Sequence, residues 1–388
     1  MMTLFDYLNI NEEELKEAVM TSNLDNVLKS AVVLILNEYM EKERDEYLET
    51  AKYERVAERR DYRNGYYERE LMITVGRVKL KVPRTREGGF STSVFEKYAR
   101  VDQAFMLSML EMVVSGVSTR KVTNVIETLC GETVSKSFVS SLTAQLDPIV
   151  NQWASRPLNV TTYRYLHVDA MYIKVRENRK VVSKAVYIAT AISTDNRREV
   201  VGLKIDQAES FEAWQSFLQS LKRRGLQSPD LVISDAHEGL KKAISQEFVG
   251  TSWQRCTVHF KRNLLKALPK KMAKSFMADV RTIFMSSDLE GAREAKERLV
   301  EKYAKEPRVQ KALDILEGGY DEATQFLNEP SRYHRYTSST NHLERLNQEV
   351  RRREQVIRIF PNEQSAFRLI GAVLMEADER LQKGSPLR

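Results

Sequence analysis

The sequence contains very little cysteine and no long apolar segment. Two cysteines among 388 residues are too few for a disulfide framework, which favours a reducing, cytoplasmic environment. The longest purely apolar run, residues 31–36, is far shorter than the roughly 20 residues that a membrane-spanning helix needs. The N-terminus has no basic segment followed by an apolar stretch, so no secretory signal and no membrane partner are predicted.

Internal repeats and low-complexity tracts are also absent, which argues against repetitive and disordered architectures. The hydrophobic content of 42% is typical of a soluble globular protein. A chain of this length exceeds a single ordinary core, so we expect two to three domains of about 100–200 residues each.

Charge is unevenly distributed along the chain, whose formal net charge is +7. Residues 1–54 contain 13 acidic and 5 basic side chains, whereas residues 55–100 contain 12 basic and 6 acidic ones. A further basic tract, residues 255–281, has 8 basic side chains against 1 acidic. Separated basic tracts favour a polyanion such as nucleic acid as the partner, with solubility as the alternative for any single tract.

The N-terminal region is predicted to be a helical arm followed by a hairpin. Residues 12–60 carry an apolar stripe among charged positions, which indicates a helix that packs or dimerises. Residues 70–83 read as a hairpin around Gly76. Alternation in its second strand predicts a buried apolar face and a cationic face, which either tracks phosphates or is simply solvated. The cationic side chains are Arg77, Lys79, Lys81, Arg84 and Arg86.

Residues 103–146 have the pattern of a helix-turn-helix pair. Ser118 and Ser135 are predicted N-caps, and Gly131 is a predicted helix terminator between them. Such a pair either reads DNA or is merely structural. The predicted DNA contacts on it are Arg120, Lys121 and Lys136.

After Trp153 the pattern changes to alternating strands and helices. This order predicts an α/β fold with a mixed sheet and helices on its faces. Residues 260–335 read as almost entirely helical, with a break at Gly318-Gly319. The predicted elements are strands 164–175, 181–194 and 198–206, a helix 210–224, a strand 230–234, a helix 237–246 and a strand 253–258.

Three acidic residues stand at predicted secondary-structure edges. Asp169 lies within a strand, Asp235 closes a short apolar strand, and Glu344 opens a basic helix. Carboxylates from distant parts of a chain can share two divalent cations, which cut and rejoin phosphodiester bonds. Helix capping is the alternative for two of them, because Asp235–Glu238 and Asn341–Glu344 both have the form of a capping box. Only Asp169 lacks a local alternative.

Histidine and cysteine lie close to these carboxylates. The first 166 residues contain none of the five histidines, and His167, His237 and His342 lie within two residues of a proposed ligand. Histidine beside a metal-bound carboxylate can orient it or move a proton. Cys256 and His259 form half of a zinc pattern, but the only other cysteine lies far upstream, so no structural zinc is expected.

A combination of motifs resembles the Mutator-type transposases of bacterial insertion sequences. The motifs are His167-Val-Asp169-Ala, Ile233-Ser-Asp235-Ala-His-Glu-Gly239, Arg255-Cys-Thr-Val-His259 and Thr340-Asn-His-Leu-Glu344-Arg-Leu-Asn347. Upstream, Arg63-Asn-Gly65, Val82-Pro-Arg84 and Ser115-Gly-Val-Ser-Thr-Arg-Lys121 are similar to the same family. The similarity runs from about residue 60 to residue 375.

The resemblance implies an RNase H-like catalytic core whose DDE triad is interrupted by a helical insertion. It places the triad on Asp169, Asp235 and Glu344, with two Mg²⁺ or Mn²⁺ ions as cofactors. The predicted supporting residues are His167, His237, Cys256, His259 and Asn341.

The expected domains follow from this resemblance and from the patterns above. They are an acidic helical arm (1–54), a DNA-binding region with hairpin and helix pair (55–150), the first part of the core (160–259), a helical insertion (260–337) and C-terminal helices with Glu344 (338–388). Basic side chains of the last two are predicted to hold DNA near the metals. They are Lys261, Arg262, Lys266, Lys270, Lys271, Arg345, Arg351, Arg352 and Arg353.

We therefore expect a transposase that cleaves and joins DNA at the terminal inverted repeats of its own element. Two element ends and target DNA must meet, so a homodimer or higher homo-oligomer is expected. A metal-dependent nuclease without strand transfer and a DNA-binding regulator without catalysis are the alternatives. Copy-out transposition through a circular intermediate is implied by the resemblance alone.

Overall fold

The computed structural model describes residues 24–50, 60–73, 76–95, 103–130 and 134–387. The chain divides into two compact units, residues 1–143 and 144–388. Within the described ranges no helix is both long and apolar enough to cross a membrane. Of the helix predicted over residues 12–60, the described part is α3 (Leu24–Leu48); residues 12–23 and 51–59 lie outside the described ranges.

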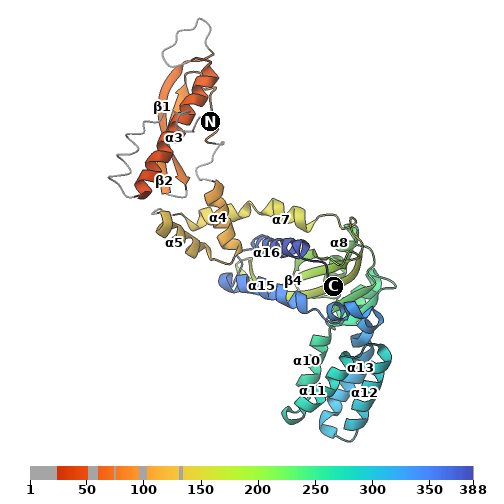
Figure 1. The fold of residues 1–388 in the computed structure, drawn as a ribbon. Coiled ribbons are helices and arrows are strands. Elements are labelled where there is room, and N and C mark those ends of the chain that lie inside the picture. Colours follow the sequence, from red (N-terminus) through yellow and green to blue (C-terminus); the bar gives the residue numbers. More distant parts are fainter. Residues whose placement is uncertain (1–23, 51–59, 74–75, 96–102, 131–133, 388) are drawn as a thin grey trace. The chain divides into compact units, whose positions relative to one another are not determined.

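In the first unit α3 packs on a two-stranded antiparallel sheet of β1 (Arg63–Ile73) and β2 (Gly76–Thr85) (Figure 1). The period-two pattern predicted for β2 is confirmed, because Val78, Leu80 and Val82 are buried while the basic residues between them are exposed. The buried side chains form a core with Met40 of α3. The amphipathic strand is therefore held by the apolar stripe of one helix.

Three helices follow in this unit: α4 (Gln103–Val114), α5 (Thr119–Cys130) and α6 (Lys136–Ala144). Both predicted N-caps are confirmed. Ser118 Oγ accepts the Lys121 amide at 3.3 Å, and Ser135 Oγ accepts the Phe138 amide at 3.0 Å. The predicted terminator Gly131 lies outside the described residues.

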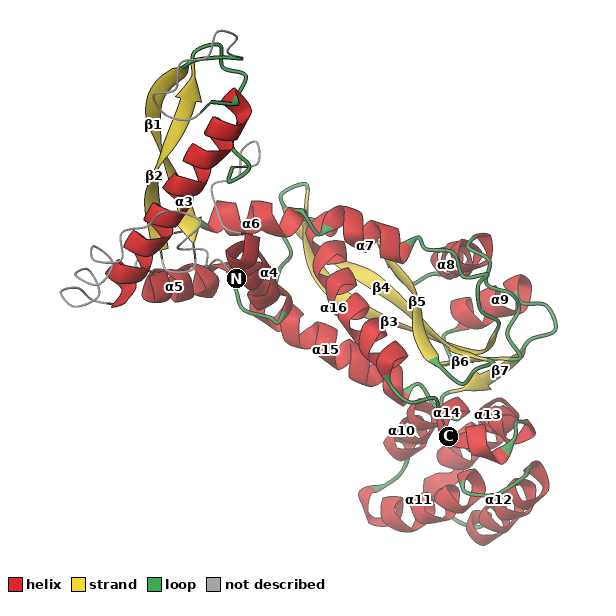
Figure 2. Cartoon of the chain, turned by 45° about the horizontal axis from the view of Figure 1, so that its top comes forward, coloured by secondary structure: helices red, strands yellow, loops and turns green. Residues whose placement is uncertain are grey.

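The second unit is built on a five-stranded mixed sheet (Figure 2). Its strands are β3 (Tyr163–Glu177), β4 (Lys180–Ser193), β5 (Arg198–Asp206), β6 (Leu231–Ser234) and β7 (Ser252–Arg255). In space the order is β5-β4-β3-β6-β7; the first three strands pair antiparallel, whereas β6 and β7 run parallel to β3. Parallel neighbours need crossover connections, which α8 (Phe211–Arg223) and α9 (Glu238–Glu247) supply.

Helices cover both faces of this sheet, which confirms the predicted mixed sheet with flanking helices (Figure 2). On one face Trp214 and Phe217 of α8 and Leu240 of α9 pack against Leu166 and Val168. On the other face α15 (Asn341–Ile357) and α16 (Glu363–Lys383) lie against the strands, and α7 (Asp147–Ala154) packs on α16. Residues 185–193 of β4 are consequently buried on both sides, which matches their nearly continuous apolar sequence.

The strand predicted over residues 253–258 is too long at its C-terminal end. Pairing with β6 stops where Ser234 meets Arg255, and the Cys256 amide then donates to the Ser234 carbonyl at 2.7 Å. Helix α10 begins directly afterwards, at Thr257. Beyond Arg255 the chain packs as a helix. A short apolar run in the sequence fits a buried strand and a buried helix equally well, so the pattern could not separate the two.

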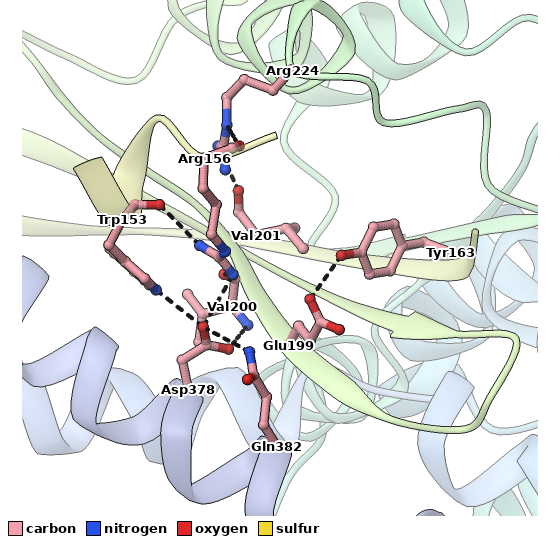
Figure 3. Close-up of polar contacts among 9 residues, drawn as sticks. All are labelled: Trp153, Arg156, Tyr163, Glu199, Val200, Val201, Arg224, Asp378 and Gln382. Carbon is pink, nitrogen blue, oxygen red and sulfur yellow. Dashed lines mark hydrogen bonds and ion pairs between the residues drawn. The ribbon is translucent and has the colours of Figure 1, made fainter. Parts of the chain in front are cut away.

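A polar network closes the edge strand β5, where its register with β4 shifts. The buried Asp378 carboxylate of α16 accepts hydrogen bonds from the Val200 amide at 2.8 Å and from Trp153 and Arg156 at 3.0 Å each (Figure 3). Arg156 and Arg224 donate to backbone carbonyls of the same segment at 2.7 Å. A bulge leaves backbone groups without ladder partners, and these side chains satisfy them.

An all-helical segment lies between β7 and α15. It comprises α10 (Thr257–Ala267), α11 (Lys270–Phe284), α12 (Leu289–Tyr303), α13 (Gln310–Thr324), α14 (His334–Thr337) and the 3₁₀ turns Pro307–Val309, Gln325–Asn328 and Ser331–Tyr333. The break predicted at Gly318-Gly319 is wrong, because α13 continues through both. A Cβ at Gly319 would lie 2.5 Å from the Phe260 ring, so this glycine permits close packing of α13 on α10.

Helix α15 is tied to the core at both ends. Before its first turn, the Ser338 carbonyl accepts the Thr257 amide of α10 at 3.0 Å. After its last turn, Phe360 pairs with the end of β3, donating to the Lys174 carbonyl at 2.9 Å and accepting from the Arg176 amide at 2.8 Å. The position of α15 relative to β3 is thereby fixed.

Candidate active site

Asp169 lies on β3, and Asp235 directly follows the last residue of the neighbouring strand β6, level with Asp169. The parallel register of β3 and β6 ends with the pair His167 and Ile233, and each aspartate follows two residues later. Level positions on parallel strands point to the same face, and such strands are about 4.8 Å apart. The sheet therefore brings together two carboxylates that are distant in sequence.

The Asp169 carboxyl occupies a negatively charged, partly buried position. Its pKa is raised to about 7, first by burial and then by the carboxylates of Asp235 and Glu344. Its two hydrogen-bond donors are neutral: the Ala170 amide at 2.9 Å and Asn347 Nδ2 at 2.8 Å. Carboxylates this close repel each other, and a cation bound between them would remove that repulsion.

Asp235 does not cap helix α9. The N-cap is His237, whose Nδ1 accepts the Leu240 amide at 3.3 Å. The capping-box interpretation of Asp235 is therefore wrong, and its carboxylate is left for the site. His237 therefore caps α9, and its Nδ1 lies 3.8 Å from Glu209. It does not make the predicted supporting contact with the carboxylates of the site.

The capping interpretation also fails at α15. Thr340 occupies the N-cap position without a side-chain cap bond, and Asn341 is the exposed first residue of the helix. The structure gives Asn341 no side-chain contact at the site, so its predicted supporting role is not supported by position. Glu344 instead turns toward α10.

One stripe of α15 faces the site. Thr340, Glu344 and Asn347 follow at intervals of four and three residues, which places them on one helical face. The first two contact α10, and Asn347 contacts Asp169 on β3. Asn347 is buried, and its Oδ1 has no hydrogen-bond partner among the described residues.

Cys256 and His259 connect the first turn of α10 to this stripe. Thr340 donates to Cys256 Sγ from its amide at 3.4 Å and from its hydroxyl at 3.3 Å. Glu344 Oε1 lies 3.3 Å from His259 Nε2 and 3.7 Å from Arg262. A hydrogen bond with Cys256 raises the pKa of His259 against the effect of burial, and nearby carboxylates act in the same direction. His259 therefore contacts Glu344, and Cys256 contacts Thr340 at the start of the same helix.

A buried pair of histidines lies between α15 and the sheet. The His167 and His342 rings meet edge to face with centroids 4.2 Å apart. His342 Nε2 lies 2.6 Å from Thr190 Oγ1, and His167 Nε2 lies 2.8 Å from the Tyr336 carbonyl oxygen. Burial lowers the pKa of both rings well below the usual value, so both are neutral and hold α15 against β3 and β4.

The family model described as "Transposase, Mutator family" matches residues 3–384. The chain belongs to the Mutator family of transposases. The transposase for insertion sequence element IS256 in transposon Tn4001 of Staphylococcus aureus is 51% identical over 370 residues, covering 95% of each chain. The transposase for ISRM5 of Rhizobium meliloti is 40% identical, covering 93% of this chain and 90% of that one. These similarities confirm the predicted family and the predicted function, an insertion-sequence transposase and hence a DNA-processing enzyme.

The transposase also matches a solved structure, the HTLV-2 integrase catalytic core domain in complex with magnesium. It covers 40% of this chain and 86% of that chain at 11% identity, with a TM-score of 0.18. Similarity at this level supports no conclusion about fold or metal, so the fold rests on the strand order of the transposase itself.

The carboxylates suit a divalent cation in chemistry. Mg²⁺ and Mn²⁺ prefer oxygen ligands, and the repulsion between Asp169 and Asp235 raises the pKa of Asp169 although His259 acts in the opposite direction. Within the described part of the chain, no three His, Cys, Asp or Glu side chains are gathered closely enough to hold a metal. Glu344 is the member directed elsewhere, toward His259 and Arg262.

The predicted DNA contacts of the transposase differ in exposure. The prediction that Arg353 contacts DNA at the surface is wrong, because Arg353 is buried and pairs with Glu349. Lys261 is partly buried with its Nζ 4.7 Å from the Phe284 ring centre, and Arg352 pairs with Glu349 at 3.0 Å. The remaining members are exposed: Lys266, Lys270, Lys271, Arg345 and Arg351 in the second unit, and Arg77, Lys79, Lys81, Arg84, Arg86, Arg120, Lys121 and Lys136 in the first.

Sequence reasoning did not select Asn347 as a site residue of the transposase. The sequence does contain a sign of it, because Asn347 is a polar residue on a helix side whose other members, Leu343, Leu346 and Val350, are apolar. Its distance of three residues from Glu344 would have placed both on one face. Only the packing of α15 on β3 shows that the amide reaches Asp169.

Proposed function

We propose that the transposase has an RNase H-like core and that Asp169, Asp235 and Glu344 are its DDE triad. The observation that carries this proposal is the level placement of two carboxylates, one on β3 and one directly after β6, with the Glu344-bearing helix fixed beside them. Three antiparallel strands followed by two parallel ones support the fold. Two Mg²⁺ or Mn²⁺ ions are the proposed cofactors.

Divalent cations bound by these carboxylates would activate an attacking oxygen and stabilise charge on the phosphate. In cleavage, water attacks phosphorus in line, forming one P–O bond while the bond to the 3′-oxygen breaks. In joining, the freed 3′-OH attacks a target phosphodiester and displaces its bridging oxygen. Each step exchanges one P–O bond for another, so no covalent enzyme intermediate is required.

The protein contributes orientation in this mechanism. Asn347 holds one oxygen of Asp169 through its amide, and strand pairing fixes the backbone on which Asp169 and Asp235 stand. His259 and Arg262 hold Glu344 from α10. The contacts of Asp169 restrict its freedom before DNA arrives, which is how preorganised sites lower a barrier. Glu344 would exchange its contacts with His259 and Arg262 for the cations.

The DNA partners proposed for the transposase are its terminal inverted repeats and a target duplex. The exposed polar face of α6, with Lys136, Ser137, Ser140 and Ser141, suits close approach to base edges. Exposed lysines and arginines would supply phosphate contacts and a salt-dependent affinity. A homodimer or higher oligomer would bring two ends together, and light scattering of the DNA complex measures this directly.

A joining assay tests the proposed reaction. The transposase is incubated with Mg²⁺ or Mn²⁺, a pre-nicked terminal repeat and a target duplex, and joined product is expected. Asp169→Asn, Asp235→Asn and Glu344→Gln should each abolish it while DNA binding persists. Cleavage that never yields joined product would favour the nuclease alternative, and DNA binding with neither cleavage nor joining would favour a regulator. Unaltered joining in any one of the three variants would remove that residue from the triad.

A further inference from the structure

The two ends of the hairpin in the first unit differ in charge compensation. Near its turn, Arg77 pairs with Glu70 at 2.7 Å, and the antiparallel register sets Lys79 opposite Glu70 and Lys81 opposite Glu68. Opposite charges on facing positions attract each other and reduce the net charge of this face. Three of the five basic side chains predicted for this row, Arg77, Lys79 and Lys81, therefore lie beside or opposite carboxylates of the neighbouring strand.

At the open end of the hairpin a concave pocket of about 280 Å³ lies between the strands and the loop that follows β2. Arg84 and Arg86 are exposed at this pocket, and within the described ranges neither forms an ion pair. Glu87 is the acidic side chain among the described lining residues. The lining also includes Tyr67, Arg69 and Phe90.

Aromatic rings stand beside both unpaired arginines. The Arg84 guanidinium lies 5.9 Å from the centre of the Tyr67 ring, and that of Arg86 lies 5.7 Å from the Tyr62 ring. Tyr67 is 42% exposed although it is a large aromatic side chain. Exposed aromatic rings interleaved with arginine are the usual platform for unstacked nucleic-acid bases.

Two carboxylates, the buried Asp61 and the half-buried Glu43, hold the walls of this pocket in place. Asp61 accepts the Tyr62 amide at 2.6 Å and the Glu87 amide at 3.1 Å. Glu43 of α3 accepts the Ser93 amide at 3.2 Å and the hydroxyl of Thr92. The loop is thus anchored at both sides, so a ligand would not have to order it on binding.

We propose that this pocket of the transposase holds one unpaired nucleotide of the DNA, with Arg84 and Arg86 on its phosphate and Tyr67 against its base. Arginine matches phosphate geometry through paired N–H donors. The volume is at the lower end of ligand pockets, about 300–1,000 Å³, which suits one nucleotide rather than a longer segment. A duplex phosphate alone would leave the exposed Tyr67 ring without a partner. The proposal rests on the proposed function only in taking DNA as the substrate.

Fluorescence anisotropy with the full-length protein, in the absence of divalent cations, tests the phosphate contacts. The probes are a random-sequence blunt duplex and the same duplex with an oligothymidine tail. Arg84→Ala/Arg86→Ala should weaken binding to the tailed probe about tenfold or more and reduce its salt dependence by about 0.7–0.9 counterion, the value for one phosphate. The matched control, Lys79→Ala/Lys81→Ala, removes the same charge from the same strand and should cost less than about threefold. Equal losses in the two double variants would overturn the proposal.

The base contact is tested with Tyr67→Leu and its neighbour Tyr66→Leu as the control. Tyr67→Leu should weaken the tailed probe about tenfold and leave the blunt duplex nearly unchanged. Tyr66→Leu, an exposed ring that does not line the pocket, should affect neither probe. Loss on both probes alike, or on neither, would overturn the assignment. Circular dichroism confirms folding, and because binding is measured without metal, its result is independent of whether joining occurs.

Discussion

Asp169 and Asp378 are two carboxylates of the same unit with opposite surroundings. Asp378 is buried but receives hydrogen bonds from a backbone amide, an indole and the cationic Arg156 (Figure 3). Asp169 receives only two neutral donors and faces Asp235 and Glu344, which together with burial raise its pKa to about 7. Asp378 has a cationic hydrogen-bond donor, whereas both hydrogen-bond donors of Asp169 are neutral and His259 only partly offsets the repulsion.

The difference separates a structural from a functional use of a buried charge. Burying an ion is costly unless partners within the fold compensate it. Asp378 meets that condition and joins α7, β5 and α16 across a strand bulge. Asp169 meets it only in part, and perturbed carboxylates of this kind are characteristic of functional sites.

The largest expected effect tests the functional side of this comparison. Asp169→Asn should lower strand joining by about a thousandfold or more, because a carboxamide is a poor replacement for a carboxylate metal ligand. Its free energy of unfolding should not fall, because the repulsion with Asp235 and Glu344 is removed. Joining and urea unfolding are measured together, with the exposed Asp195→Asn as control. Full joining activity in Asp169→Asn would remove it from the triad.

The structural side is tested by Asp378→Ala. Removing this carboxylate leaves Arg156 and the Val200 amide without their partner, so the free energy of unfolding should fall by about 3–5 kcal/mol. Joining per folded molecule should be retained. Urea unfolding measures the loss, and Glu379→Ala on the exposed side of α16 is the matched control. If Asp378→Ala is as stable as the wild type, the hydrogen bonds to the Asp378 carboxylate do not contribute to the stability of the fold.

Asn347 is the side chain that donates to Asp169, in the place where Asp378 has the cationic Arg156. Asn347→Ala should weaken Mn²⁺ binding and joining by about 10–100-fold, the usual effect of removing a group that orients a metal ligand. Calorimetric titration of Mn²⁺ and the joining assay measure the two effects. The neighbouring exposed residue gives the control Gln348→Ala. Wild-type metal affinity in Asn347→Ala would limit Asn347 to a packing role.

A third carboxylate, Asp147, gives the smallest expected effect and a pH dependence. It pairs with Arg368 of α16 at 2.6 and 2.8 Å, and chiefly this hydrogen-bonded contact lowers its pKa below 3.8. A lowered folded-state pKa stabilises the protein above the unfolded value and loses that contribution as the pH falls through the folded value. Asp147→Asn should therefore cost about 1–3 kcal/mol at neutral pH.

Urea unfolding of the wild type and of Asp147→Asn across the acid range measures this dependence. Their difference in unfolding free energy should shrink as the pH falls below about 4. A constant difference at every pH would show that the Arg368 contact does not depend on the carboxylate charge.

Local patterns were sufficient for much of the fold. Alternation along β2, the serine caps of α5 and α6, and the short apolar run of β6 each depend on neighbouring residues alone. Two predictions failed where a distant partner decides the outcome. The end of β7 is set by pairing with Ser234, and α13 continues through Gly319 because Phe260 packs there.

The sequence by itself determined the family, the mixed sheet and the carboxylates available for metal chemistry. It left Asp235 and Glu344 open to a capping interpretation, because a capping box is defined by spacing alone. Tertiary structure decided that His237 caps α9 and that Asp235 stands level with Asp169. It also brought Asn347 to Asp169 and His259 to Glu344, because strand register and the two anchored ends of α15 fix distances that no local pattern encodes.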